Sequence, residues 1–175
     1  MATAPQPAQH EPLYIYNGGI VLLWPYLQRY FSLLALQKDG AFLGEGQQQR
    51  AVHLLHYLSR GTIEAPAQAL ALNKILCGMD VAAPVESGGA LTEQEQQVSA
   101  QVLQAVMQHW HALGKTSEEG LRSVFLQRAG SLVQADHQWR LRVERGSFDM
   151  LLGGLPWSFS TIRLPWMQRV LEVSW

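Results

Sequence analysis

The sequence predicts a compact, mainly α-helical domain with a small antiparallel β element near its C-terminus, an α+β fold. Apolar residues recur at helical spacing up to about residue 129, two Thr-x-x-Glu patterns mark helix starts, and the hydrophobic period changes to two after Gly130. A chain of 175 residues is long enough for one hydrophobic core. We therefore expect a flexible N-terminal lead-in at 1–12 and a single helical domain at 13–175, closed by a small sheet at about 131–175.

Five helices account for most of the predicted structure, at about 25–36, 46–59, 66–77, 92–112 and 117–129. Pro25 suits the first turn of the first helix, and residues 20–24 before it fit either a helical turn or a short buried strand. A glycine follows the second and third helices, where it commonly ends a helix. Thr92 and Thr116 each stand three residues before a glutamate, which predicts a capping box at the start of the fourth and fifth helices.

Strand periodicity is confined to the C-terminal part. After a loop at 80–90 and the last two long helices, the apolar side chains of Leu132, Trp139, Leu141 and Val143 alternate with polar ones. Residues 135–137 can supply the turn of a hairpin. A short helix is expected at 148–152 and a last strand at 170–174, with Trp139 and this strand in the core.

Composition excludes several classes of function. Charged residues make up 15% of the chain, against about 25% in a typical domain, and the net charge is −1. Basic residues are scattered and the pI is about 6.6, so nucleic-acid binding is not expected. The longest apolar run, near 20–36, is interrupted by Pro25, Gln28 and Arg29, so no membrane span is expected. The single cysteine, Cys77, is expected to be a buried thiol.

The titratable residues form no complete catalytic or metal-binding set. His53 and His56 are three residues apart on a predicted helix, but a zinc site needs three or four ligands. Asp136 and His137 fall in the predicted hairpin turn, where aspartate is favoured for its own backbone hydrogen bond. The sequence contains neither a Gly-x-Ser-x-Gly elbow nor a phosphate-binding glycine loop. We therefore predict no catalytic residue, no cofactor, no metal and no enzymatic activity.

The tail of the chain carries the candidate protein-interaction residues. Two Leu-Pro-Trp units lie nine residues apart, and proline and tryptophan make each unit a rigid apolar anchor. The candidates are Leu155, Pro156, Trp157, Leu164, Pro165, Trp166, Met167 and Trp175. Such anchors dock either on the core of their own chain or on another protein, and for Trp166 the sequence leaves both alternatives open.

Several blocks of the chain resemble the C-terminal region of tape measure proteins from contractile injection systems, the phage-tail-like particles of bacteria. The blocks are Tyr14–Leu27, Gln49–Leu58, Leu72–Gly78, Thr116–Arg122, Phe125–Arg128, Leu155–Trp157 and Thr161–Met167. Their order and spacing extend the resemblance over nearly everything from about residue 13 onward. The resemblance implies a non-enzymatic component of the particle, associated with tube length and with the baseplate end during assembly.

Members of this family usually carry long additional sequence before this region, so we expect this piece to anchor rather than to measure. The resemblance implies that its partners are other particle proteins, either the baseplate hub and spike or the inner tube, and leaves a homo-oligomer open. It also implies a location in the bacterial cytoplasm during assembly and then within the particle. The alternative is an assembly chaperone or adaptor that binds a particle component without staying in the particle. A cell-wall hydrolase is a more distant third hypothesis.

Overall fold

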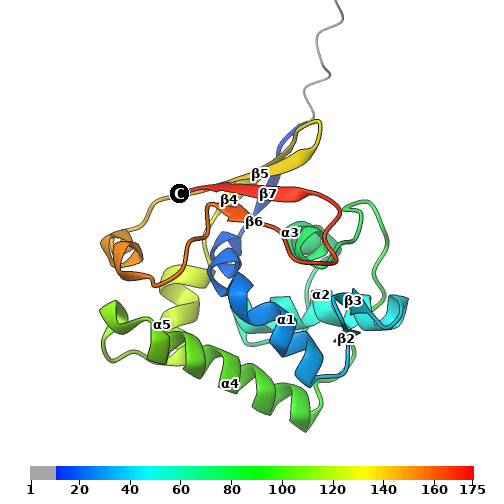
Figure 1. Ribbon diagram of the computed structural model, residues 1–175, viewed down its shortest axis with the longest axis horizontal. Helices are drawn as coiled ribbons and strands as arrows, with labels where there is room; N and C mark the ends of the chain where they lie inside the picture. The colour runs from blue at the N-terminus through cyan, green and yellow to red at the C-terminus, as the bar shows by residue number, and fades with distance from the viewer. Residues whose placement is uncertain (1–10) are drawn as a thin grey trace, which may run out of the picture.

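The computed structural model describes residues 11–175 and contains two regions, a layer of helices and a five-stranded sheet (Figure 1). Most of the lead-in expected at 1–12 lies outside the described residues. Helical segments, including short 3-10 and π turns labelled η, are η1 (Gly18–Leu23), α1 (Trp24–Leu33), α2 (Glu45–Arg60), η2 (Ala67–Leu70), α3 (Ala71–Leu76), α4 (Glu93–His109), η3 (His111–Leu113), α5 (Glu118–Leu121), η4 (Arg122–Leu126) and η5 (Asp149–Gly154). Strands are β1 (Leu13–Ile15), β2 (Gln37–Lys38), β3 (Ala41–Phe42), β4 (Gly130–Gln134), β5 (Gln138–Val143), β6 (Thr161–Ile162) and β7 (Val170–Ser174).

The prediction of a mainly α fold was wrong. Of the residues that the structure describes, 47% are helical and 15% are in strands, and their large sheet has five strands in the order β1-β4-β5-β7-β6. Neighbouring strands are antiparallel except β5 and β7, which run parallel, so the sheet is mixed rather than antiparallel. The fold is a compact α+β domain.

Three pairings of short strands explain why the sequence analysis predicted too little β structure. β1 joins the sheet from the N-terminal end of the described chain and pairs with β4. β6 pairs with β7, and β2 forms a separate hairpin with β3. These strands have two or three residues each, too few for an alternating pattern to stand out from the sequence around them.

The predicted helices are present, with changes at their ends. Residues 20–24 form the end of a 3-10 turn and the start of α1, so the helical alternative was correct. The helix predicted at 66–77 is split into η2 and α3, and the one at 117–129 into α5 and a π turn. Thr92 and Glu95 form the predicted capping box. At the next helix the cap is Ser117, which accepts from the backbone of Gly120, so the box predicted at Thr116 was wrong.

The core lies between one face of the sheet and the helices. A cross-strand row of Leu132, Leu141 and Val173 is buried on this face. All six residues of η1 are buried where the chain passes from the sheet into the helical layer. There Gly19 lies against the backbone of η4, and a Cβ atom at this position would be 1.6 Å from the carbonyl oxygen of Phe125. The close packing of η1 against η4 therefore depends on a missing side chain.

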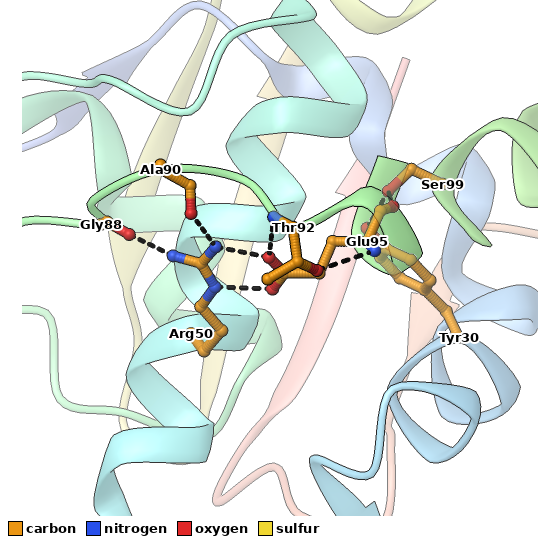
Figure 2. A network of polar contacts seen from close by, with 7 residues as sticks. All are labelled: Tyr30, Arg50, Gly88, Ala90, Thr92, Glu95 and Ser99. Carbon is orange, nitrogen blue, oxygen red and sulfur yellow. Dashed lines mark hydrogen bonds and ion pairs between the residues drawn. The ribbon is translucent and has the colours of Figure 1, made fainter. Parts of the chain in front are cut away.

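A polar network joins α2, the loop before α4, and α4 itself (Figure 2). The guanidinium of Arg50 donates to both carboxylate oxygens of Glu95, at 2.6 and 2.5 Å, and to the carbonyls of Gly88 and Ala90. Glu95 also accepts from the backbone N–H of Thr92 at 2.9 Å. A forked arginine–carboxylate pair is stronger than a neutral hydrogen bond and fixes direction as well as distance. One side chain of α2 thereby holds the otherwise irregular loop at 80–90.

We expect Gly19→Ala to destabilise the domain by at least about 3 kcal/mol, because the new methyl group meets backbone that cannot move aside. Gly46→Ala is the matched control, since a Cβ at this position in α2 meets no atom within 4 Å. Alanine is the better helix former, so Gly46→Ala should change stability by at most about 1 kcal/mol, in the stabilising direction. Urea denaturation measures both variants, and equal midpoints would contradict the packing described at Gly19.

Glu95 should contribute to the acid sensitivity of the fold. Burial raises the pKa of its carboxyl group, but hydrogen bonds from Arg50 and Thr92 outweigh burial and leave the pKa below the ordinary value of 4.5. A carboxylate with a lowered pKa stabilises the folded state above the ordinary pKa, and this contribution is lost as the pH falls below it. Glu95→Gln should therefore flatten the fall in unfolding free energy below about pH 4.5.

The control for this experiment is Glu93→Gln, two residues away at an exposed position of the same helix. Glu93 makes no ion pair within residues 11–175, so its replacement should flatten the slope of stability against pH less than Glu95→Gln does. Denaturation at a series of pH values between 3 and 7 measures both slopes. If Glu95→Gln has the wild-type slope, the Arg50–Glu95 pair does not cause the loss of stability at low pH.

Candidate protein-interaction site

The predicted interaction residues other than Trp175 lie in the segment that connects β5 to β7. Because these two strands are parallel, the chain leaves β5 at one end and must return to the other end before it can enter β7. It does so through η5, β6 and the loop beside α3, crossing the molecule from one side to the other (Figure 1). Both Leu-Pro-Trp units are in this return segment.

The first unit is joined to the start of α1 by two reciprocal hydrogen bonds. The indole N–H of Trp157 donates to the carbonyl of Leu22 at 2.8 Å, and the indole N–H of Trp24 donates to the carbonyl of Ser158 at 2.8 Å. The ring of Trp157 also packs edge-on against Tyr26, with centroids 5.2 Å apart. Leu155 and Trp157 are half-buried, and Pro156 is exposed. The indole groups satisfy main-chain carbonyls where a 3-10 turn passes into an α-helix.

The second unit packs against α1, β3 and α3. Leu164 and Met167 are buried, Trp166 is half-buried and Pro165 is exposed. The Trp166 ring contacts Phe31 and Phe42, with centroids 5.7 and 5.0 Å away. Its indole N–H donates to the carbonyl of Leu76, the last residue of α3, at 2.7 Å. This bond satisfies a carbonyl that the end of a helix leaves without an intrahelical partner.

Gly78 allows the second unit to approach α3 this closely. A Cβ atom on Gly78 would lie 2.3 Å from the carbonyl oxygen of Trp166, and the glycine has a left-handed φ of 74°. The sequence suggested Gly78 only as a helix stop. Its second role, as a contact surface for the return segment, depends on a residue far along the chain and was not predictable from its local sequence.

Trp175 is held by a charged pair. Its indole N–H donates to Asp149 at 2.9 Å, and the guanidinium of Arg128 lies 5.4 Å from the centre of its ring. Arg128 donates to both oxygens of the Asp149 carboxylate, at 2.6 and 3.1 Å. Burial raises the pKa of Asp149, but these hydrogen bonds and one from the backbone of Gly146 outweigh it and lower the pKa overall. Asp149 is therefore charged at neutral pH and links η5, η4 and the end of β7.

All the large side chains of the candidate set thus contact their own chain. Trp139 and, in β7, Leu171 and Val173 lie in the core, as predicted. For the candidates as a group, a role in binding another protein stays a prediction. Their exposed parts are the two prolines and the outer edges of the half-buried rings.

Other exposed apolar residues were missed by the sequence analysis. Tyr14 and Tyr16 are 71% and 66% exposed on the outer face of the sheet, and Phe148 and Met150 are exposed around η5. The signal for the tyrosines was present in the short alternation Leu-Tyr-Ile-Tyr at 13–16, in which Ile15 is buried. Four residues before a turn gave too little sequence to identify a strand.

His53, His56 and His109 each lie in separate surroundings. The Nε2 atom of His53 lies 2.6 Å from the carbonyl oxygen of Glu86, and the Nδ1 atom of His109 lies 2.5 Å from the hydroxyl of Tyr26. Burial lowers the pKa of His56, which favours its neutral form. Within residues 11–175, no three His, Cys, Asp or Glu side chains come close enough together to hold one metal ion. No helix in the same range is long and apolar enough to cross a membrane.

A family model described as contractile injection system tape measure protein matches residues 2–175. The chain belongs to the contractile injection system tape measure protein family. No curated protein and no solved structure is significantly similar to it. Membership of the tape measure family supports a structural role in a contractile injection system.

Trp166 gives the clearest test of whether the return segment stabilises the fold. We expect Trp166→Ala to cost about 3 kcal/mol, because it removes two aromatic contacts and leaves the carbonyl of Leu76 without its donor. The melting temperature should fall by about 6–12 °C for a domain of this size.

Met150→Ala is the control for this experiment, since Met150 is 78% exposed and should contribute less than about 0.5 kcal/mol. Calorimetry or thermal melting followed by circular dichroism measures both variants. An unchanged melting temperature for Trp166→Ala, with the protein lost from particles, would instead assign Trp166 to a docking surface.

Proposed function

We propose that this chain is a non-enzymatic structural and assembly component of the particle, which anchors to the baseplate hub or to inner tube proteins. The match to the tape measure family over residues 2–175 is the observation that carries the structural role. The anchoring role goes further and is argued from the shape of the fold.

A compact domain is poorly suited to measuring a length. The longest helix, α4, has 17 residues, which at about 1.5 Å per residue extends about 26 Å. The five strands of the large sheet lie side by side, and the return segment joins the C-terminal part to the start of α1 and the end of α3. These features are typical of a rigid domain that anchors at one position. They are not typical of an extended domain that spans a distance.

The distribution of titratable groups also favours a non-enzymatic role. The two charged pairs with both partners largely buried, Arg50–Glu95 and Arg128–Asp149, are saturated by hydrogen bonds within the chain. Catalytic groups instead present a reactive atom to a cleft and have pKa values matched to proton transfer near neutral pH. Asp136 and His137, considered as a hydrolytic pair, are exposed beyond the end of β4.

The alternative is an assembly chaperone or adaptor. Such a protein binds the same partners but leaves before the particle is complete. Both functions need a stable domain with an exposed binding surface, so the fold alone does not separate them. They differ in where the protein is found after assembly.

Mass spectrometry of purified particles tests the proposal. Cells that produce the complete particle should yield assembled particles that contain this chain at a fixed ratio to the sheath protein. The ratio should survive a second gradient purification, because an anchored component dissociates slowly. Addition of the wild-type chain to finished particles is the control for adsorption. A chain present in the lysate and missing from particles would support the chaperone.

A further inference from the structure

The outer face of the large sheet carries an arginine whose side chain makes no hydrogen bond or ion pair with the described part of the chain. Tyr14, Ser131, Arg142 and Ser174 lie side by side in register on β1, β4, β5 and β7. Side chains alternate between the two faces of a strand, and Leu141 and Val143 are buried toward the helices, so Arg142 points to the opposite face. The helices lie on one side of the sheet only (Figure 1). Arg142 is exposed and makes no side-chain hydrogen bond or ion pair within residues 11–175.

The small residues on either side of Arg142 create two hollows. Ser131 and Ser174 are its direct cross-strand neighbours, about 5 Å away on each side. A hollow of about 400 Å³ on the β4 side is lined by residues that include Tyr14, Tyr16, Ser131 and Arg142. A hollow of about 560 Å³ on the β7 side is lined by Arg142, Val143, Glu144, Arg145, Ser174 and Trp175. Arg142 therefore stands between two concave surfaces that both open to solvent.

Two arginines and one glutamate line these hollows. Arg142 and Glu144 line both hollows, and Arg145 lines only the one on the β7 side, so the charged side chains sum to zero on the β4 side and to +1 on the β7 side. The aromatic rings of Tyr14 and Tyr16, which are 71% and 66% exposed, border the same surface. Arginine, tyrosine and tryptophan are the residues that most often carry the binding energy of protein interfaces.

We propose that this face, defined by Tyr14, Tyr16, Ser131, Arg142 and Ser174, binds a segment of another particle protein that presents a carboxylate side chain to Arg142. This proposal rests on the proposed function and names the surface through which it acts. The guanidinium matches a carboxylate in a two-pronged geometry, and the serine hydroxyls on both sides supply further donors. The aromatic rings cover the apolar part of the partner segment and exclude water from the pair.

Retention of variants in particles tests the role of the charge. Arg142→Gln should reduce the amount of this chain per particle at least tenfold, because the partner carboxylate would then be buried without its counter-charge. Arg142→Lys keeps the charge but loses the fork, and it should give an intermediate amount. Arg29→Gln is the matched control, an exposed arginine on α1 away from the sheet. Thermal melting should be unchanged for all three variants, which separates binding from folding.

Site-specific crosslinking identifies what occupies the face. The photoreactive residue p-benzoylphenylalanine in place of Tyr14 keeps an aromatic ring at the exposed position. Irradiated particles should yield one adduct with another particle protein. Replacing an aspartate or glutamate of that crosslinked segment by arginine should abolish retention, and combining it with Arg142→Glu should restore at least a third of the wild-type amount.

Each contrary result has a distinct meaning. If the wild-type chain is present in particles but Arg142→Gln is retained equally, the proposed face is wrong and the anchoring function stands. A crosslink to a second copy of this chain would replace the acidic partner by self-association and overturn the proposal. If the wild-type chain is absent from particles, the proposed function itself is wrong.

Discussion

The parallel pairing of β5 with β7 is the constraint on which the rest of the fold depends. An antiparallel neighbour could follow β5 after a tight turn, but a parallel one requires the chain to travel back along the whole strand. Residues 144–169 make this return, and they do so across the helical layer rather than through solvent. The sheet and the helices are consequently joined by covalent chain, by the indole hydrogen bonds of Trp157 and Trp166, and by the apolar contacts of Leu164 and Met167.

Tryptophan suits this return segment because one side chain combines a large apolar area with a single hydrogen-bond donor. The carbonyls of Leu22 and Leu76 lie where helical hydrogen bonding is interrupted, so each would otherwise need water or another donor. The indole groups satisfy them while their rings cover the neighbouring apolar surface. The same residue types mark protein interfaces, which is why the sequence alone could not separate docking on the chain itself from docking on a partner. The structure leaves the outer face of the sheet, not the tryptophan-rich segment, as the more open surface.

Sequence reasoning was most successful where the determinants are local. The capping box of Thr92 and Glu95 and the hairpin of β4 and β5 depend on residues a few positions apart, and both are present. It failed where a distant partner decides the outcome. Three residues at 13–15 form a strand only because β4 offers them a free edge, and the direction of β7 depends on where the preceding segment is held. For the same reason Arg142 drew no attention, since a serine on each side becomes a hollow only when three strands are placed in register.

Charged residues are few in this protein, so a charged residue that has no role in the fold calls for another explanation. Arg50 and Arg128 each close a network between elements, and Arg122 donates to the carbonyl of Leu58 at the end of α2. In these three cases removal of the arginine would leave buried acceptors unpaired, so the fold itself accounts for the residue. Arg142 has no such role in the described chain, and a threonine or valine would fit the exposed face of a strand better. Local choices that do not serve the fold tend to gather at sites that serve function. The position of Arg142, between two serines and beside exposed aromatic rings, is therefore better explained by a partner than by stability.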